Sequence, residues 1–131
     1  MGAELFDARP DLLIDTADAV LGWSLREVCL EGPEDRLTAT EHAQPALYAL
    51  SYVLWDALVP HLDEVEVAAA AGHSLGEYTA LAAAGVLGFE DGLRLVAERG
   101  QAMADAAALE PSGMAALIGA DESSAEALCA A

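Results

Sequence analysis

The sequence contains no lysine, and this absence defines its surface chemistry. Its 131 residues carry five arginines against 23 aspartates and glutamates, for a formal net charge of −18 at pH 7. A surface this acidic repels nucleic-acid phosphates and anionic lipids. We therefore predict that the chain binds neither nucleic acid nor membranes. Because cations are so scarce, each arginine becomes a candidate ligand for an anionic substrate.

Cysteines and long apolar runs are also scarce. Cys29 and Cys129 form no CxxC pair, and the scattered histidines have no cysteine or carboxylate pair at ligand spacing. These histidines are His42, His61 and His73. The most apolar run, residues 65–71, contains Glu66 and is too short to span a bilayer. The pattern predicts no disulfide framework, no metal site and no transmembrane helix.

The remaining composition is typical of a folded domain. Hydrophobic residues make up 55% of the chain and the mean hydropathy is +0.33, which argues against disorder despite the charge. The length fits one modest domain. The N-terminus shows no basic region followed by an apolar stretch, so we expect no signal peptide and a cytoplasmic location.

The spacing of apolar residues predicts mainly helices, separated by glycine and proline. The S-x-x-E pattern at Ser24 is a capping box that opens a short helix, and Pro45 suits the first turn of a longer one. We expect helices over residues 11–21, 24–30, 45–60, 76–84, 89–108 and 121–131, and a helical turn within 34–41. Two short apolar runs, 65–71 and 114–118, are predicted as strands, with a linker over 111–113. The first run is rich in alanine, which favours helix, but it ends at Gly72 directly before a motif that follows strands.

That motif is G-x-S-x-G, which residues 72–76 spell as Gly-His-Ser-Leu-Gly. In a nucleophile elbow, a sharp turn between strand and helix strains the serine backbone and projects its hydroxyl. Both positions require glycine, because we expect a Cβ on Gly72 or Gly76 to crowd neighbouring backbone. The helix that follows would direct its N-terminal N–H groups at the serine, with the Leu75 amide as an oxyanion donor. Ser74 is thus the candidate nucleophile.

A general base for Ser74 is not evident. His73 is adjacent in sequence, but neighbours at such a turn point in different directions, so we expect His73 to orient or pack the elbow. In hydrolases with this elbow, the catalytic histidine follows the nucleophile along the chain, and here no histidine follows Ser74.

Four blocks, in order and spacing, resemble the malonyl-CoA:acyl carrier protein transacylase family. Residues 72–81 (GHSLGEYTAL) resemble its active-site motif, and residues 43–47 (AQPAL) resemble its TQPAL block, with Ala43 in place of threonine. Residues 98–103 (ERGQAM) resemble its arginine helix, and residues 113–119 (GMAALIG) resemble the strand that enters its small subdomain. The match covers nearly the whole chain.

The resemblance also shows two departures. Family members open with a glycine-glutamine loop (GQGSQ) that helps to build the oxyanion hole, and they are more than twice as long as this chain, with their catalytic histidine in the C-terminal half. The chain therefore resembles an N-terminal-half fragment of the enzyme. We expect such a fragment to be inactive alone.

The resemblance implies a mechanism without a metal or redox cofactor. Ser74 would take the malonyl group from malonyl-CoA and pass it to the phosphopantetheine thiol of acyl carrier protein. Arg99 would bind the malonate carboxylate, and Gln44 would shape the pocket. From the sequence alone, Arg99 could instead form a surface ion pair with Glu98 or Asp105, and Gln44 could simply flank the start of a helix.

The implied fold class is α/β. Residues 1–110 would form part of a hydrolase-like parallel sheet flanked by helices, and residues 111–131 would begin a ferredoxin-like small subdomain. Leu75 and Tyr78 resemble the free-standing enzyme of fatty-acid synthesis more than the acyltransferase domains of polyketide synthases, which remain an alternative. A serine esterase or thioesterase is a second alternative, which a carboxylate-binding Arg99 would disfavour. A catalytically silent interaction module is a third, consistent with the missing histidine and loop.

Overall fold

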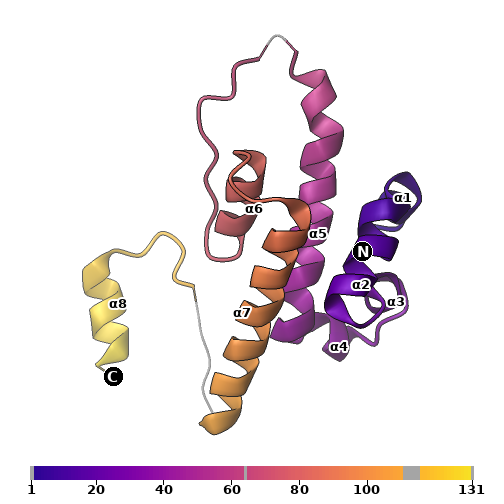
Figure 1. Ribbon diagram of the computed structural model, residues 1–131. Coiled ribbons are helices and arrows are strands. Elements are labelled where there is room, and N and C mark those ends of the chain that lie inside the picture. Colours follow the sequence, from indigo (N-terminus) through magenta and orange to yellow (C-terminus); the bar gives the residue numbers. More distant parts are fainter. Residues whose placement is uncertain (1, 64, 111–115, 131) are drawn as a thin grey trace.

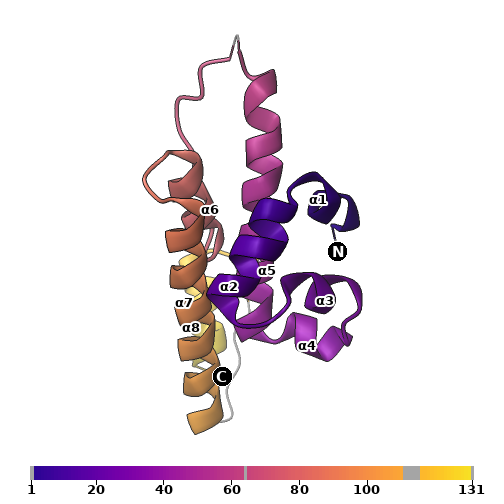
Figure 2. The same ribbon diagram turned by 45° about the vertical axis from the view of Figure 1, so that its right-hand side comes forward.

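A computed structural model describes residues 2–63, 65–110 and 116–130 (Figure 1). Two long helices, α5 (Thr40–Leu58) and α7 (Phe89–Leu109), pack along one another and form the centre of the structure. The other helical elements are α1 (Ala3–Ala8), η1 (Asp11–Thr16), α2 (Ala17–Leu21), α3 (Leu25–Leu30), α4 (Glu34–Thr38), η2 (Val59–His61), α6 (Gly76–Ala83) and α8 (Glu122–Cys129). Figure 2 shows the N-terminal helices beside α5 and α7. Of these, α1, η1 and α3 contact α5, and α2 contacts α7.

The N-terminal helices follow the sequence pattern closely. The predicted helix over residues 11–21 is present as η1, a π-helix, continued by α2, and Gly22 ends it with φ +75°. The predicted capping box is confirmed at its serine, because Ser24 Oγ accepts a hydrogen bond from the Glu27 N–H at 3.4 Å. The pattern did not predict α1, whose Phe6 is buried in the core.

The start of α5 was predicted wrongly. The helix begins at Thr40 rather than Pro45, so the proline lies inside it. A proline there has no N–H to donate to the carbonyl of Glu41, which costs the helix one backbone hydrogen bond. Gln44, Pro45 and Ala46 are all buried, so tertiary packing outweighs this local cost.

The core between α5 and α7 centres on Tyr48. Its ring is fully buried and stacks on Phe89 at a centroid distance of 6.1 Å, while its hydroxyl donates to the Gly88 carbonyl at 3.4 Å. Burial raises the pKa of Tyr48 to about 12. Gly92 of α7 faces this ring so closely that a Cβ there would overlap Tyr48 Oη and lie 2.5 Å from Cζ. The missing side chain is therefore what lets the two helices approach.

The predicted parallel sheet is wrong for the residues that the structure describes. Residues 65–71 form an exposed, extended segment without a ladder, and 116–118 form no strand either. A strand is stable only when a neighbour pairs with its backbone, and the described part of the chain provides no such neighbour. The hydrolase-like sheet and the first strand of a ferredoxin-like subdomain are therefore not observed.

The C-terminal predictions have a mixed outcome. The predicted last helix is present as α8, with the Asp121 side chain capping its first turn through the Ser124 N–H at 2.9 Å. The linker at 111–113, the start of the second strand and the domain boundary after residue 110 fall on residues outside the described ranges. No helix among the described residues combines the length and apolar character needed to cross a membrane.

The substitution Gly92→Ala tests the contact between α5 and α7. Overpacking costs about 1–3 kcal/mol, and alanine returns about 1 kcal/mol through its helix propensity. We therefore expect a net loss of about 0–2 kcal/mol in the free energy of unfolding, measured by urea denaturation. Adding Tyr48→Phe, which removes Oη, should recover part of that loss. Gly88→Ala is the control, because a Cβ there meets nothing within 4 Å.

Candidate active site

Ser74 occupies a strained turn directly before α6. Its φ is +54°, the only positive φ of a non-glycine residue among those described. The turn is closed by hydrogen bonds from the Gly76 N–H to the His73 carbonyl at 2.9 Å and from the Glu77 N–H to the Ser74 carbonyl at 3.3 Å. A backbone strained in this way costs about 1–3 kcal/mol and recurs at functional sites. The predicted strain at the serine is thus confirmed, and the side chain is exposed.

The two glycines of the elbow, residues 72–76, are not equivalent. A Cβ on Gly72 would overlap the carbonyl group of Gly76 and lie 2.6 Å from the Glu77 nitrogen. These are backbone atoms that cannot rotate away, so the steric reason predicted for Gly72 is confirmed. A Cβ on Gly76 would meet no described atom within 4 Å. The same prediction for Gly76 is therefore wrong. The backbone of Gly76 is what a Cβ on Gly72 would hit, but a Cβ on Gly76 itself has space.

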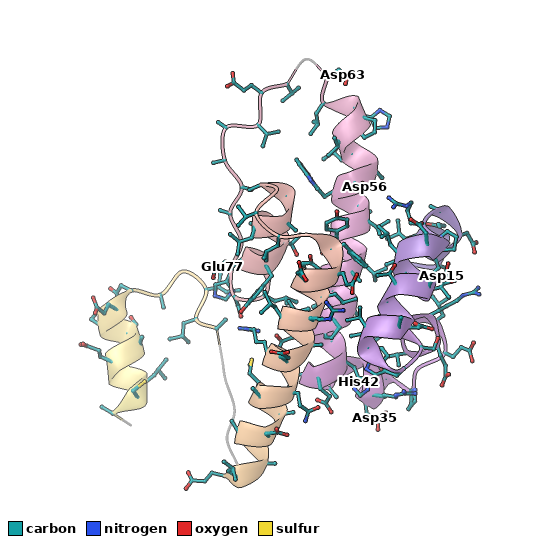
Figure 3. All side chains as sticks on the ribbon, in the orientation of Figure 1. Asp15, Asp35, His42, Asp56, Asp63 and Glu77 are labelled. Carbon is teal, nitrogen blue, oxygen red and sulfur yellow. The ribbon has the colours of Figure 1, made fainter. Side chains whose placement is uncertain are left out.

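The first turn of α6 presents an open donor beside the serine. Leu75 is the N-cap residue of α6, and its N–H donates to no atom of the described residues. The helix N-terminus adds positive potential at this point. Glu77, labelled in Figure 3, belongs to the same turn and is exposed. An oxyanion that formed next to Ser74 would have the Leu75 N–H within the same turn.

Arg99 reaches Ser74 from α7. Its Nη2 donates to Ser74 Oγ at 2.9 Å, and its Nη1 donates to Gln44 Oε1. Its guanidinium carbon lies 5.9 Å from the centroid of the Tyr78 ring on α6. The structure thus brings together three residues that are distant in sequence: Ser74 from the turn before α6, Arg99 from α7 and Gln44 from α5.

The partners of Arg99 are all uncharged. Arg9, Arg36 and Arg94 each pair with a carboxylate, whereas in the described part of the chain Arg99 pairs with none. Asp105, considered above as an ion-pair partner, instead accepts from Gln101 Nε2 at 2.8 Å. The predicted surface ion pair is therefore not observed, and no carboxylate of the described residues pairs with the guanidinium.

Gln44 is the buried polar residue that holds Arg99. Its side chain is 6% exposed, and its Nε2 donates to Thr40 Oγ1 at 2.7 Å and to Met103 Sδ at 3.3 Å. Sequence reasoning did not identify Thr40 or Met103. The available signal was spacing, because Thr40 lies one turn before Gln44 and Met103 one turn after Arg99, on the same helix faces.

The structure provides no general base at Ser74. Among the described residues no histidine nitrogen is hydrogen-bonded to Ser74 Oγ, and His73 is exposed. His42 lies near the start of α5 (Figure 3), where its ring packs against Trp23 at a centroid distance of 4.9 Å with the two planes tilted by 59°. His61 lies in η2, after the opposite end of α5. The described residues also contain no cluster of three side chains suited to a metal ion.

Substitution of the elbow glycines should separate their roles. We expect Gly72→Ala to force the turn open and to speed amide exchange over residues 73–80 by about tenfold or more, the equivalent of 1.4 kcal/mol of strain. Gly76→Ala should leave exchange unchanged or slow it, because alanine favours helix. Hydrogen exchange followed by mass spectrometry measures both. Equal acceleration in the two variants would contradict the asymmetry.

Comparison with known proteins places these residues in a family. Residues 1–130 match the acyl transferase domain family. The polyketide biosynthesis protein ThaF of Burkholderia thailandensis is 46% identical over 93% of this chain and 10% of its own length. The malonyl CoA-acyl carrier protein transacylase of Salmonella typhimurium is 42% identical over 86% of this chain and 36% of its own length.

Solved structures agree with the sequence relatives. A malonyl CoA-acyl carrier protein transacylase from Coxiella burnetii superposes with a TM-score of 0.78 at 36% identity, over 99% of this chain and 42% of that one. A malonyl-transacylase in complex with its type II PKS acyl-carrier protein gives a TM-score of 0.77 at 37% identity, over 99% and 42% of the respective chains. The chain spans less than half the length of each of these relatives. With its match over residues 1–130, the chain belongs to the acyl transferase domain family.

Proposed function

We propose that the protein containing this chain transfers a malonyl group from malonyl-CoA to the phosphopantetheine thiol of acyl carrier protein. The observation that carries the proposal is the 2.9 Å hydrogen bond between Arg99 Nη2 and Ser74 Oγ. It sets a permanent cation beside the candidate nucleophile. Relatives named malonyl CoA-acyl carrier protein transacylases support the substrate and the partner, and no metal or redox cofactor enters the proposed steps.

The position of Arg99 suits a malonyl group better than a neutral acyl group. In malonyl-CoA a single methylene separates the carboxylate from the thioester carbonyl, so a carbonyl at Ser74 holds its carboxylate close to the guanidinium. Arg99 can bind that carboxylate through charge-assisted hydrogen bonds. A serine esterase or thioesterase acting on a neutral chain would leave this charge without a partner, which disfavours that alternative.

The proposed transfer takes two steps. In the first, Ser74 Oγ forms a bond to the malonyl carbonyl carbon, the carbon–sulfur bond of the thioester breaks, and coenzyme A leaves as its thiol with the proton from Oγ. In the second, the sulfur of the carrier thiol forms a bond to the malonyl carbonyl carbon, the ester bond to Ser74 Oγ breaks, and the thiol proton returns to Oγ. The Leu75 N–H stabilises the oxyanion in both steps.

A general base must carry that proton between the two groups. From the family resemblance we expect this base to be a histidine in the C-terminal half of the longer relatives. Loss of a general base lowers a rate by about 10²–10⁴-fold. We therefore propose that the 131-residue chain alone transfers malonyl groups too slowly to support turnover.

An acyltransferase of polyketide synthesis is the second candidate function. The names of two relatives favour it, since ThaF and the malonyl CoA-acyl carrier protein transacylase PksC of Bacillus subtilis are both polyketide biosynthesis proteins. The residues Leu75 and Tyr78 favour the fatty-acid enzyme, as argued from the sequence. Both candidates share the reaction and differ in the carrier protein. The cytoplasmic location stays a prediction.

The nucleophile can be tested by trapping the intermediate. We expect incubation of the full-length protein with malonyl-CoA to add one malonyl group, located on Ser74 by peptide mass spectrometry. Ser74→Ala should abolish the adduct because, among the described residues, no other serine has a positive φ. An adduct that persists in Ser74→Ala would disprove the assignment.

The proposed binding of the malonyl carboxylate by Arg99, here called the carboxylate clamp, can be tested through substrate selectivity. Loss of a charge-assisted partner costs about 2–5 kcal/mol, so we expect Arg99→Ala to lower kcat/KM for malonyl-CoA by well over tenfold and to affect acetyl-CoA much less. Arg94→Ala is the matched control on the same helix, since Arg94 is exposed and paired with Glu90. An unchanged ratio of malonyl to acetyl transfer in Arg99→Ala would refute the clamp.

A further inference from the structure

We propose that Thr40 is a positioning residue for malonyl selectivity, because it fixes the side-chain amide of Gln44 and thereby the guanidinium of Arg99. The inference rests on the proposed function and concerns a residue that does not itself touch the substrate. It follows from a continuous chain of hydrogen bonds from Thr40 through Gln44 and Arg99 to Ser74.

The side-chain amide of Gln44 must present its oxygen, Oε1, to Arg99. A guanidinium only donates hydrogen bonds, so a reversed amide would set NH₂ against N–H and lose the bond. The amide is anchored at its other end, where Nε2 donates to Thr40 Oγ1 at 2.7 Å and to Met103 Sδ at 3.3 Å. Thioether sulfur is a weak acceptor. A threonine hydroxyl can donate or accept, so Arg99 sets which way the amide faces, and Thr40 supplies the stronger of the two contacts that hold the amide in place.

Thr40 is itself held rigidly. It is the first residue of α5, one helical turn before Gln44, and its β-branched side chain has few rotamers. Its carbonyl oxygen would lie only 2.8 Å from a Cβ on Gly100, the residue after Arg99. The start of α5 is thus packed directly against α7 next to Arg99. This contact fixes the position of Thr40 relative to the Arg99 guanidinium.

Loss of the Thr40 hydrogen bond would change the orientation of the Arg99 guanidinium and leave its charge unchanged. With Nη1 bound to Gln44, the plane of the guanidinium is set and Nη2 points to the site of Ser74. If the amide were free to turn, Arg99 would keep its charge but lose this orientation. A carboxylate that binds through two parallel hydrogen bonds requires the orientation, whereas a neutral acetyl group does not. Selectivity should therefore fall without loss of the basic reaction.

The test compares Thr40→Val, which keeps the shape but removes Oγ1, with Thr40→Ser, which keeps the hydroxyl. In the full-length protein we expect Thr40→Val to lower the ratio of kcat/KM for malonyl-CoA to that for acetyl-CoA by about threefold to tenfold, the effect of one hydrogen bond. Thr40→Ser should restore the wild-type ratio. Because this ratio is independent of the fraction of folded protein, partial unfolding of a variant does not affect it.

Two further variants separate the possible results. Thr38→Val is the matched control, since Thr38 is exposed and its hydroxyl donates to the Glu34 carbonyl at 2.9 Å, outside this network. Arg99→Ala tests the clamp itself. If Arg99→Ala shifts the ratio and Thr40→Val does not, the role of Thr40 is overturned and the proposed function stands. If Arg99→Ala leaves the ratio unchanged, both are overturned.

Discussion

The close contact between α5 and α7 is the constraint on which both the core and the site depend. Gly92 leaves room for the buried ring of Tyr48, and Gly100 lets the start of α5 approach the α7 backbone. Side chains at these two positions would push the helices apart. Because the helices are close, Gln44 and Arg99 can form a hydrogen bond across 55 positions of sequence. The packing that stabilises the chain therefore also builds the candidate anion site.

The acidic character of the chain bears on the selectivity proposed for that candidate anion site. In a protein of net charge −18, most arginines are neutralised by nearby carboxylates, as Arg9 is by Asp11 and Arg94 by Glu90. Arg99 instead contacts an amide oxygen, a hydroxyl oxygen and an aromatic ring, which orient the guanidinium and leave its charge uncompensated. In the proposed function, a substrate carboxylate would gain the full charge-assisted interaction, while the acidic surroundings would disfavour nonspecific anions.

Sequence reasoning succeeded where the determinants were local. The strain at Ser74, the helix after it and the long helix that carries Arg99 depend on nearby residues and were predicted. It failed where the determinants were distant. An alanine-rich run such as 65–71 becomes a strand only with a paired neighbour, and the described residues provide none. Pro45 was read as a helix start because its burial against other elements is not visible in the local pattern.

The elbow and the sheet are separable in this chain. The turn at Ser74 has its positive φ although the segment before it, 65–71, has no strand partner among the described residues. Three contacts account for this: the close approach of Gly72 to Gly76, the hydrogen bonds that open α6, and the bond from Arg99 to Ser74 Oγ. All three involve helices or the turn itself. The geometry of the nucleophile and its neighbouring cation is therefore encoded by the helices on either side of it, and a sheet would add support without having to create that geometry.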